Sequence, residues 1–249
     1  VLVAVICLLP VLLALALVFL SKTVYAHEGN EQFVEMAKTL HINALAPLMA
    51  LFFATMLIAE DVENQTIPYM LTRPLPRSAW LLGRFFAYLA VTSGILVSSL
   101  LLTYAACTAL AKFGFNARDC TLALHYCGVA VSALVGYGAV MAILGATTRR
   151  PIVIGVLLLY GWQKLATLVP GLIDFLTIQK YTEALLPVLA TQRHNEEIRT
   201  ALGTFQKEVY AVTAPKAFAT LLAVAAVFLV FGVLVVRFRE YTSARAIGN

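Results

Sequence analysis

The stretch EDVENQTIPYMLTRPLPRSAWLLGR, residues 60–84, is a polar insert between two long apolar runs, and the rest of the chain is organised around it. A connection between two packed helices usually needs only about two to eight residues. This insert carries acids, arginines and prolines in roughly equal number: Glu60, Asp61, Glu63, Arg73, Arg77, Arg84, Pro68, Pro74 and Pro76. We therefore expect an ordered element here, with a plain structural turn as the alternative.

Local signals within the insert predict a short helix. Thr66 can cap its start, and Pro68 falls in the first turn, where proline is tolerated. The acids before Thr66 favour the positive end of that helix. Arg73 precedes Pro74, and a residue before proline avoids helical geometry, so the helix should stop there. We predict a short helix lying across the membrane normal between rigid proline corners.

The composition of the chain indicates a membrane protein. Of its 249 residues, 61% are hydrophobic and only 12% are charged, and the mean hydropathy is +0.87. A soluble domain has about a quarter of its residues charged. The net charge of +5 is expected for a membrane protein, because Lys and Arg are enriched in cytoplasmic loops. Because no basic stripe with interleaved aromatic residues accompanies it, we expect no nucleic-acid partner.

Six apolar runs approach or reach the roughly 20 residues that a helix needs to cross a bilayer. The predicted fold class is an all-α polytopic membrane protein with six transmembrane helices and an outer helical loop between the fifth and the sixth. The runs cover residues 1–20, 42–59, 81–110, 121–146, 151–169 and 215–236. Without repeats or flexible linkers, residues 1–249 form one domain. Because Val1 already lies inside an apolar run, we expect the native N-terminus to precede it.

Basic residues near the helix ends predict the orientation. One side of the membrane collects arginines in three short segments, whereas the basic residues of the other side are spread thinly over longer loops. The concentrated set is Arg73, Arg77, Arg84, Arg149, Arg150, Arg237, Arg239 and Arg245. We therefore place residues 60–84, residues 147–150 and the C-terminal tail in the cytoplasm. An even number of spans then puts both termini there.

The loop before the last span, residues 170–214, is the longest on the outer side. Within residues 196–209 the apolar side chains Ile198, Leu202, Phe205 and Val209 recur at helical spacing. The pattern predicts an amphipathic helix that lies on the outer surface or packs on neighbouring spans.

Two features inside the spans allow alternative interpretations. Gly128, Ser132 and Gly136 are four residues apart, and small residues at this spacing permit close packing, either within one subunit or between two. Lys164 is the only charged residue well inside a predicted span. Its side chain can extend outward to the membrane surface, or it can contact an anionic substrate or lipid head group.

No motif for catalysis or nucleotide binding occurs in the sequence. It contains no GxxxxGK[ST] phosphate-binding loop, and no Ser/His/Asp or Cys/His set falls on a plausible common face. We therefore expect no catalytic residues and no enzyme activity. The cysteines lack metal-binding spacing, so we assign no metal site, and a Cys107–Cys120 disulfide is left open. The histidines map to the outer side, and no two stand at ligand spacing: His27, His41, His125 and His194.

The insert resembles the first cytoplasmic loop of ABC-2 type transporter permeases. The matching features are the three acids, Thr66, the pair Met70-Leu71, Pro74, the step Arg77-Ser78 and the helix start LLGRF at residues 81–85. Gln65, Pro68 and Arg84 stand where that family usually has glycine, an acid and lysine. The segment TTRRP at residues 147–151 resembles the family's short second cytoplasmic loop, and the six-span pattern covers the whole chain.

The resemblance implies the transmembrane permease subunit of an ATP-driven exporter. The insert would form a coupling helix in a groove of a separate ATPase subunit, with ATP and Mg²⁺ held by that partner and no cofactor held by this chain. The coupling residues would be Glu60, Asp61, Glu63, Thr66, Leu71, Arg73, Pro74 and Arg77, with Arg149 and Arg150 in the second loop. Two ATPases would pair with two permeases, identical or different, in the plasma (inner) membrane of a prokaryote, in contact with lipids.

Two other functions stay open from the sequence. A non-conducting scaffold or maturation factor, driven by an ATPase partner, would use the long outer loop to act on an outer protein, for example a metalloprotein. A metal-handling permease would use the histidines of the outer side, since histidine is a common metal ligand.

Overall fold

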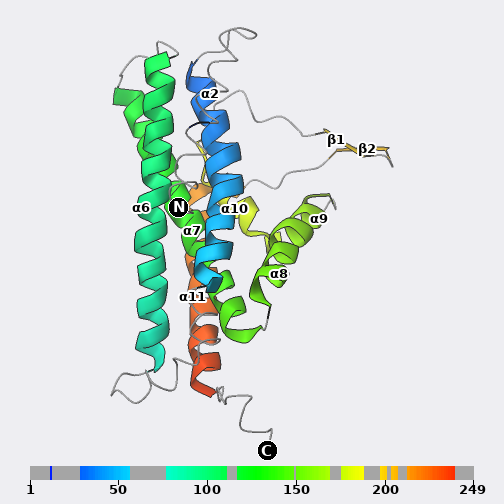
Figure 1. Ribbon diagram of the computed structural model, residues 1–249. Helices are drawn as coiled ribbons and strands as arrows, with labels where there is room; N and C mark the ends of the chain where they lie inside the picture. The colour runs from blue at the N-terminus through cyan, green and yellow to red at the C-terminus, as the bar shows by residue number, and fades with distance from the viewer. Residues whose placement is uncertain are drawn as a thin grey trace, which may run out of the picture.

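The computed structural model of the chain describes residues 12, 29–56, 77–110, 117–148, 150–168, 175–187, 197–200, 203–206 and 212–238. In this part of the chain the long helices run side by side (Figure 1). Lipid offers no hydrogen-bond partners to a bare backbone, so apolar sequence of this length folds as helices that satisfy their own backbone groups.

The first described helix covers residues 29–56 and includes two π-helical segments. Its parts are α2 (Gly29–Met36), the π-helical η1 (Ala37–Leu45), α3 (Ala46–Met49) and the π-helical η2 (Ala50–Ala54). The stretch Phe33–Ala54 is long and apolar enough to cross a membrane. The sequence predicted a span over residues 42–59, so the observed one begins nine residues earlier. Polar residues such as His41 led the prediction to start the span too late.

Three further helices agree with the predicted runs 81–110, 121–146 and 215–236. They are α6 (Arg77–Leu110), α7 (Ala117–Thr147) and α11 (Ala214–Phe238). Each contains a candidate span: Ser78–Thr108, Cys120–Thr147 and Ala214–Phe238. No charged residue interrupts α6 between Arg84 and Lys112 or α11 between Lys216 and Arg237, which explains where the apolar segments begin and end.

The predicted fifth span, residues 151–169, is a helix with a shorter apolar part. It consists of α8 (Pro151–Val156), the π-helical η3 (Leu157–Trp162) and α9 (Gln163–Leu168). Its apolar part, Pro151–Trp162, is too short to count among the candidate spans. The described residues therefore contain four candidate spans. The predicted first span, residues 1–20, lies outside them apart from Leu12, so six spans remain a prediction.

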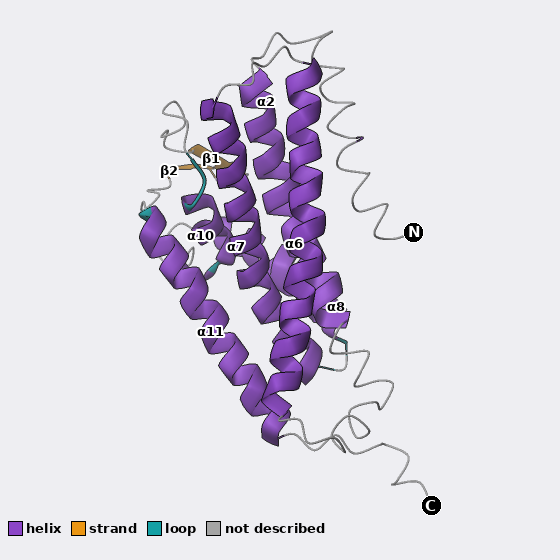
Figure 2. Ribbon diagram, turned by 90° about the vertical axis from the view of Figure 1, so that its left-hand side faces the viewer, coloured by secondary structure: helices purple, strands orange, loops and turns teal. Residues whose placement is uncertain are grey.

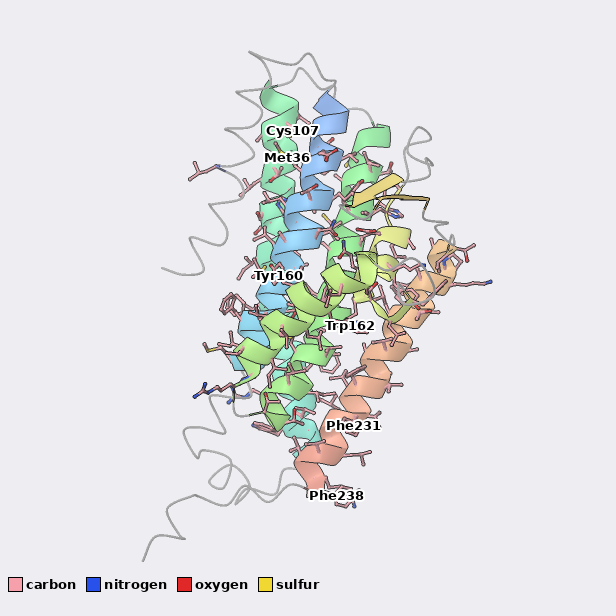
Figure 3. The ribbon with its side chains drawn as sticks, turned by 90° about the vertical axis from the view of Figure 1, so that its right-hand side faces the viewer. Met36, Cys107, Tyr160, Trp162, Phe231 and Phe238 are labelled. Atoms are coloured by element: carbon pink, nitrogen blue, oxygen red, sulfur yellow. The ribbon has the colours of Figure 1, made fainter. Side chains whose placement is uncertain are left out.

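Helix α7 occupies the centre of the bundle (Figure 2). Helices α6 and α11 pack along it, and α3, η2 and α8 also contact it. Within the candidate spans, 72% of the apolar window of α7 is buried inside the structure, against 33% for α6 and 22% for α11. The outer helices turn large apolar side chains away from the bundle, as Phe231 and Phe238 show (Figure 3). An apolar exterior of this kind suits a lipid surrounding.

Glycines let α7 and its neighbours approach closely. A Cβ atom added to Gly145 would lie 2.7 Å from the carbonyl oxygen and 3.2 Å from the Cα atom of Thr55, at the end of the first described helix. An added Cβ at Gly138 would overlap the ring of Tyr88 from α6. Such contacts allow helix backbones to pack tightly in a membrane.

The predicted small-residue stripe does not form one common interface. Gly136 faces Leu221 of α11 and Ile178, whose side-chain atoms lie 3.0 and 3.4 Å from an added Cβ. Gly128 has nothing within 4 Å. Gly136 therefore packs within the subunit, and Gly128 faces away from the described bundle.

The loop before α11 contains a short helix and a β-hairpin. Helix α10 (Ile178–Ala184) packs against α7 and α11. Strand β1 (Glu197–Thr200) pairs antiparallel with β2 (Gly203–Gln206), so that Ile198 stands opposite Phe205. The predicted amphipathic helix over residues 196–209 is therefore wrong. Gly203 costs a helix interior about 1 kcal/mol relative to alanine, whereas β-branched and aromatic residues such as Ile198 and Phe205 favour strands.

The Gly145 contact predicts a stability difference between two alanine substitutions in the same helix. Gly145→Ala forces a methyl group against the Thr55 backbone, which cannot rotate away, so we expect a loss of about 1–3 kcal/mol. Gly128→Ala meets open space and removes the helix penalty of glycine, so we expect a gain of up to about 1 kcal/mol. Equilibrium unfolding in mixed micelles measures both. Equal effects of the two substitutions would contradict the close approach.

Candidate functional site

Most of the predicted coupling residues lie outside the described residues, namely Glu60, Asp61, Glu63, Thr66, Leu71, Arg73, Pro74 and Arg149. Arg77 is the first residue of α6. Arg150 is exposed and directly precedes α8. Lys164 belongs to α9, beside the buried Gln163.

The structure brings the flanks of the predicted loops together at one end of the bundle. We call the arginine end the end formed by Met56, Arg77, Thr147, Pro151 and Phe238, which are the described helix termini nearest to the two predicted cytoplasmic loops and the C-terminal tail. These termini lie at the lower end of the helices in Figure 1. The opposite end carries the start of α2, the end of α6 and the start of α7.

A buried polar cluster centred on His41 joins the first described helix to α6. His41 is fully buried, and its Nε2 atom lies 3.3 Å from Ser99 Oγ and 3.4 Å from Thr103 Oγ1. Its Nδ1 atom faces the carbonyl oxygen of Met36 at 3.5 Å. Because a carbonyl can only accept, the proton belongs on Nδ1, and Nε2 accepts from Ser99. The Thr103 hydroxyl donates to the Ser99 carbonyl at 3.0 Å.

The position of His41 corrects the sequence-based interpretation. The sequence placed this histidine on the outer side as a candidate for metal handling, but it lies within the candidate span Phe33–Ala54. Buried polar groups in proteins need hydrogen-bond partners, and the Ser99 hydroxyl and the Met36 carbonyl supply them. With its ring wholly covered, His41 acts as a polar joint between two helices.

A second buried cluster connects α7, α9 and α10. The Tyr137 side chain lies beside those of Gln163 and Thr182. All three residues are more than nine-tenths buried. The Thr182 hydroxyl donates to the Gln179 carbonyl at 2.8 Å. Polar side chains from α7, α9 and α10 therefore meet inside the bundle.

Helix α10 is fixed by further contacts at both of its ends. At its start, the Thr177 hydroxyl accepts from the Lys180 amide at 3.4 Å and caps the helix. Beyond its last residue, the Leu185 carbonyl accepts from His125 Nε2 at 2.9 Å. Because that carbonyl can only accept, Nε2 carries a proton in this contact. The short helix is thus held to α7 at more than one level.

The described cysteines and histidines do not form a metal centre or a disulfide. Cys107, Cys120 and Cys127 are free thiols, so the Cys107–Cys120 bridge that the sequence left open is not formed. Within the described residues, no group of three or more His, Cys, Asp or Glu side chains could hold a metal ion. His27 and His194 lie outside these residues.

Sequence reasoning missed both buried clusters. Ser99 and Thr103 are four residues apart in a run without charges, and this spacing places two hydroxyls on one helix face. Gln163 stands next to Lys164, in a segment that is apolar on its N-terminal side. Polar side chains inside predicted spans are the signal that could have found these sites.

Comparison with protein-family models identifies a family. The family model described as ABC-2 family transporter protein covers residues 1–241. A search of curated proteins finds no match to the chain.

The His41 cluster predicts that losing both hydroxyls destabilises the bundle. In Ser99→Ala with Thr103→Val, the buried Nε2 atom keeps no hydroxyl donor, and an unsatisfied buried group costs about 1–3 kcal/mol. Adding His41→Leu removes the orphaned nitrogen and should recover part of that loss. The matched control is Ser98→Ala, because Ser98 is exposed and its hydroxyl donates to the carbonyl of Ile95 in its own helix.

Equilibrium unfolding in mixed micelles, followed by tryptophan fluorescence, measures these variants. The cluster would lose its assigned role if the Ser99/Thr103 double variant were as stable as the Ser98 control.

Proposed function

The chain belongs to the ABC-2 transporter family, and from this premise we propose that it is the permease subunit of an ATP-driven exporter. It is an integral, multi-pass membrane protein and the non-catalytic transmembrane component of a transporter. Family membership implies an ATPase partner in general terms. The direction of transport and the coupling through residues 60–84 are the parts that we propose.

The arrangement of helix termini at the arginine end supports the proposal that the ATPase acts on the permease there. Both helices that flank the predicted coupling loop, the first described helix and α6, have their loop-side termini there, as do α7, α8 and α11. Helix α6 runs unbroken for 34 residues, about 50 Å, and packs along α7. A displacement at Arg77 would therefore move a long rigid element against the central helix.

We assign the coupling contacts to the residues that the family pattern marks. Glu60, Asp61, Glu63, Thr66, Leu71, Arg73, Pro74 and Arg77 dock the short helix in a groove of the ATPase, and Arg149 and Arg150 add a second contact. ATP and Mg²⁺ stay on the partner, so this chain binds no cofactor. Two ATPases act on two permeases, and closure of the ATPases tilts the helices.

The topology follows from the same proposal. The arginine end faces the cytoplasm of a prokaryotic cell, both termini lie there, and residues 1–249 make up one transmembrane domain with six spans. Lys164 of α9 contacts an anionic substrate or a lipid head group.

A scaffold driven by an ATPase partner is the second candidate function. The β1–β2 hairpin stands away from the helices in Figure 1, where an outer protein could reach it. ATP-dependent transport of a substrate by the reconstituted complex would exclude this alternative, because a scaffold moves nothing across the membrane.

Removing two charges from the coupling loop should uncouple the ATPase. We expect Glu63→Ala with Arg73→Ala to lower co-purification of the ATPase subunit and to abolish substrate-stimulated ATP hydrolysis, because both charged side chains would contact the ATPase. The matched control is Glu35→Ala with Lys38→Ala, which removes an acid and a base from α2 and η1, away from the arginine end.

The measurements are the ATPase-to-permease ratio after affinity purification and the hydrolysis rate in lipid discs. Normal values for both in the Glu63/Arg73 variant would count against the coupling assignment.

A further inference from the structure

One side of α6 is open along most of its length in the described part of the chain. Only 33% of the apolar window of α6 is buried inside the structure. Its exposed residues recur at intervals of three and four, which places them on one helix face. We call this the open face of α6, and its central line consists of Gly83, Ala87, Ala90, Gly94, Ser98, Leu101 and Ala105. The line extends over about 33 Å.

Two glycines show that no other described helix covers this face. A Cβ atom added to Gly83 or to Gly94 would meet nothing within 4 Å. The two residues are about three helical turns apart, so they lie on the same side of α6. By contrast, an added Cβ atom at Gly138 or Gly145 of α7 would meet a neighbouring helix. The glycines at these two places in α7 are covered, whereas those of the open face are not.

The side chains of the open face suit contact with a helix better than contact with lipid. Small residues are enriched where two membrane helices approach closely. Larger side chains, Phe86 and Val91, border the small line on its two sides and are 62% and 55% exposed. The exposed side of α11, where Phe231 is labelled in Figure 3, is mostly bulky instead. Its large exposed residues are Phe218, Leu222, Val227, Val230, Phe231, Leu234 and Phe238.

Residues 1–20 have the length and the chemistry that fit the open face. They contain no charged residue and consist mostly of Val, Leu, Ile and Phe, so they supply the bulk that the open face lacks. A helix of 20 residues is about 30 Å long, close to the length of the small line. Leu12, the described residue of this segment, is helical.

The place of this segment in the chain directs it to α6. Residues 21–28 join it to α2, and eight residues span at most about 28 Å. Helices α2, η1 and η2 contact α6, whereas α11 packs on α6, α7 and α10. In the upper half of Figure 2, α2 lies beside α6, and α11 lies on the other side of α7. The fully exposed residues of α7 lie in its first part, within 120–128, which is too short to cover such a helix.

We propose that residues 1–20 form a membrane-spanning helix that packs on the open face of α6. Residue 20 precedes α2, which starts at the end of the bundle where α6 finishes. The new helix therefore runs parallel to α6, with residue 1 toward the arginine end. Helix α6 is then held between this helix and α7. This packing does not depend on the proposed transport function.

Disulfide trapping in the membrane tests the packing. The full chain is first freed of its native cysteines by alanine substitution at Cys7, Cys107, Cys120 and Cys127. One cysteine is then introduced at each of residues 11–15 in turn, together with Gly94→Cys. Gly94 lies one residue past the midpoint of the candidate span Ser78–Thr108, level with the middle of a parallel helix. A disulfide forms only when the two Cα atoms lie within about 7 Å.

We expect a disulfide within one chain at one or two of the five positions, because one side of the new helix faces α6. The matched control is Val227→Cys, which lies near the middle of α11 and is 65% exposed. The best yield with Gly94→Cys should be at least fivefold above the best yield with this control. Non-reducing gel electrophoresis and peptide mass spectrometry separate a bond within one chain from a bond between two.

Equal yields with Gly94→Cys and Val227→Cys would overturn the packing. A bond at residue 94 that joins two chains would also overturn it, because a second copy of the chain would then cover the open face.

A steric variant provides a second readout. Ala87→Leu with Ala90→Leu adds bulk to the open face, so we expect the disulfide yield at residue 94 to fall at least fivefold. The control, Ala223→Leu with Ala226→Leu, adds the same bulk at the same spacing to exposed residues of α11 and should leave the yield unchanged. Both variants are compared in the monodisperse fraction from gel filtration. Equal yields in the two variants would contradict the assigned face.

Discussion

Close backbone contact at α7 is the constraint on which the bundle depends. In lipid, helices gain little from covering apolar side chains, because the lipid tails are equally apolar. Association then rests on van der Waals packing and hydrogen bonds, and both need near approach. Gly145 supplies it against the Thr55 backbone, and Gly138 supplies it against Tyr88. These contacts make α7 a fixed frame against which outer helices can be positioned or moved.

Buried polar contacts between helices add to this close packing. His41 links the first described helix to α6, and Tyr137 links α7 to α9 and α10. Each joint is buried, so each must be fully paired to be stable. The first of these contacts connects the two helices that flank the predicted coupling loop, and the second connects α10 to the central helix.

The sequence predicted the helices well where apolar length alone decides them. The runs that became α6, α7 and α11 needed only the absence of charge, as between Arg84 and Lys112. It failed where tertiary contacts override composition. The prediction placed His41 in a loop, because the partners of its ring come from another helix and cannot be recognised from the neighbouring sequence. The segment around Ile198 was predicted to be a helix, because the spacing of apolar residues does not show which strands pair. The coupling loop stays a prediction from the sequence, because residues 60–76 lie outside the described residues.

The central claim is that ATP, bound by a partner at the arginine end, moves helices around α10. Pulsed EPR between nitroxide labels at Leu165 on α9 and Phe218 on α11 tests it most directly, because both side chains are exposed and their helices flank α10. In the lipid-reconstituted complex with its ATPase subunits, the distance between the labels should differ between the nucleotide-free and the ATP-trapped states. The same distance distribution in both states, with ATP bound, would contradict the account.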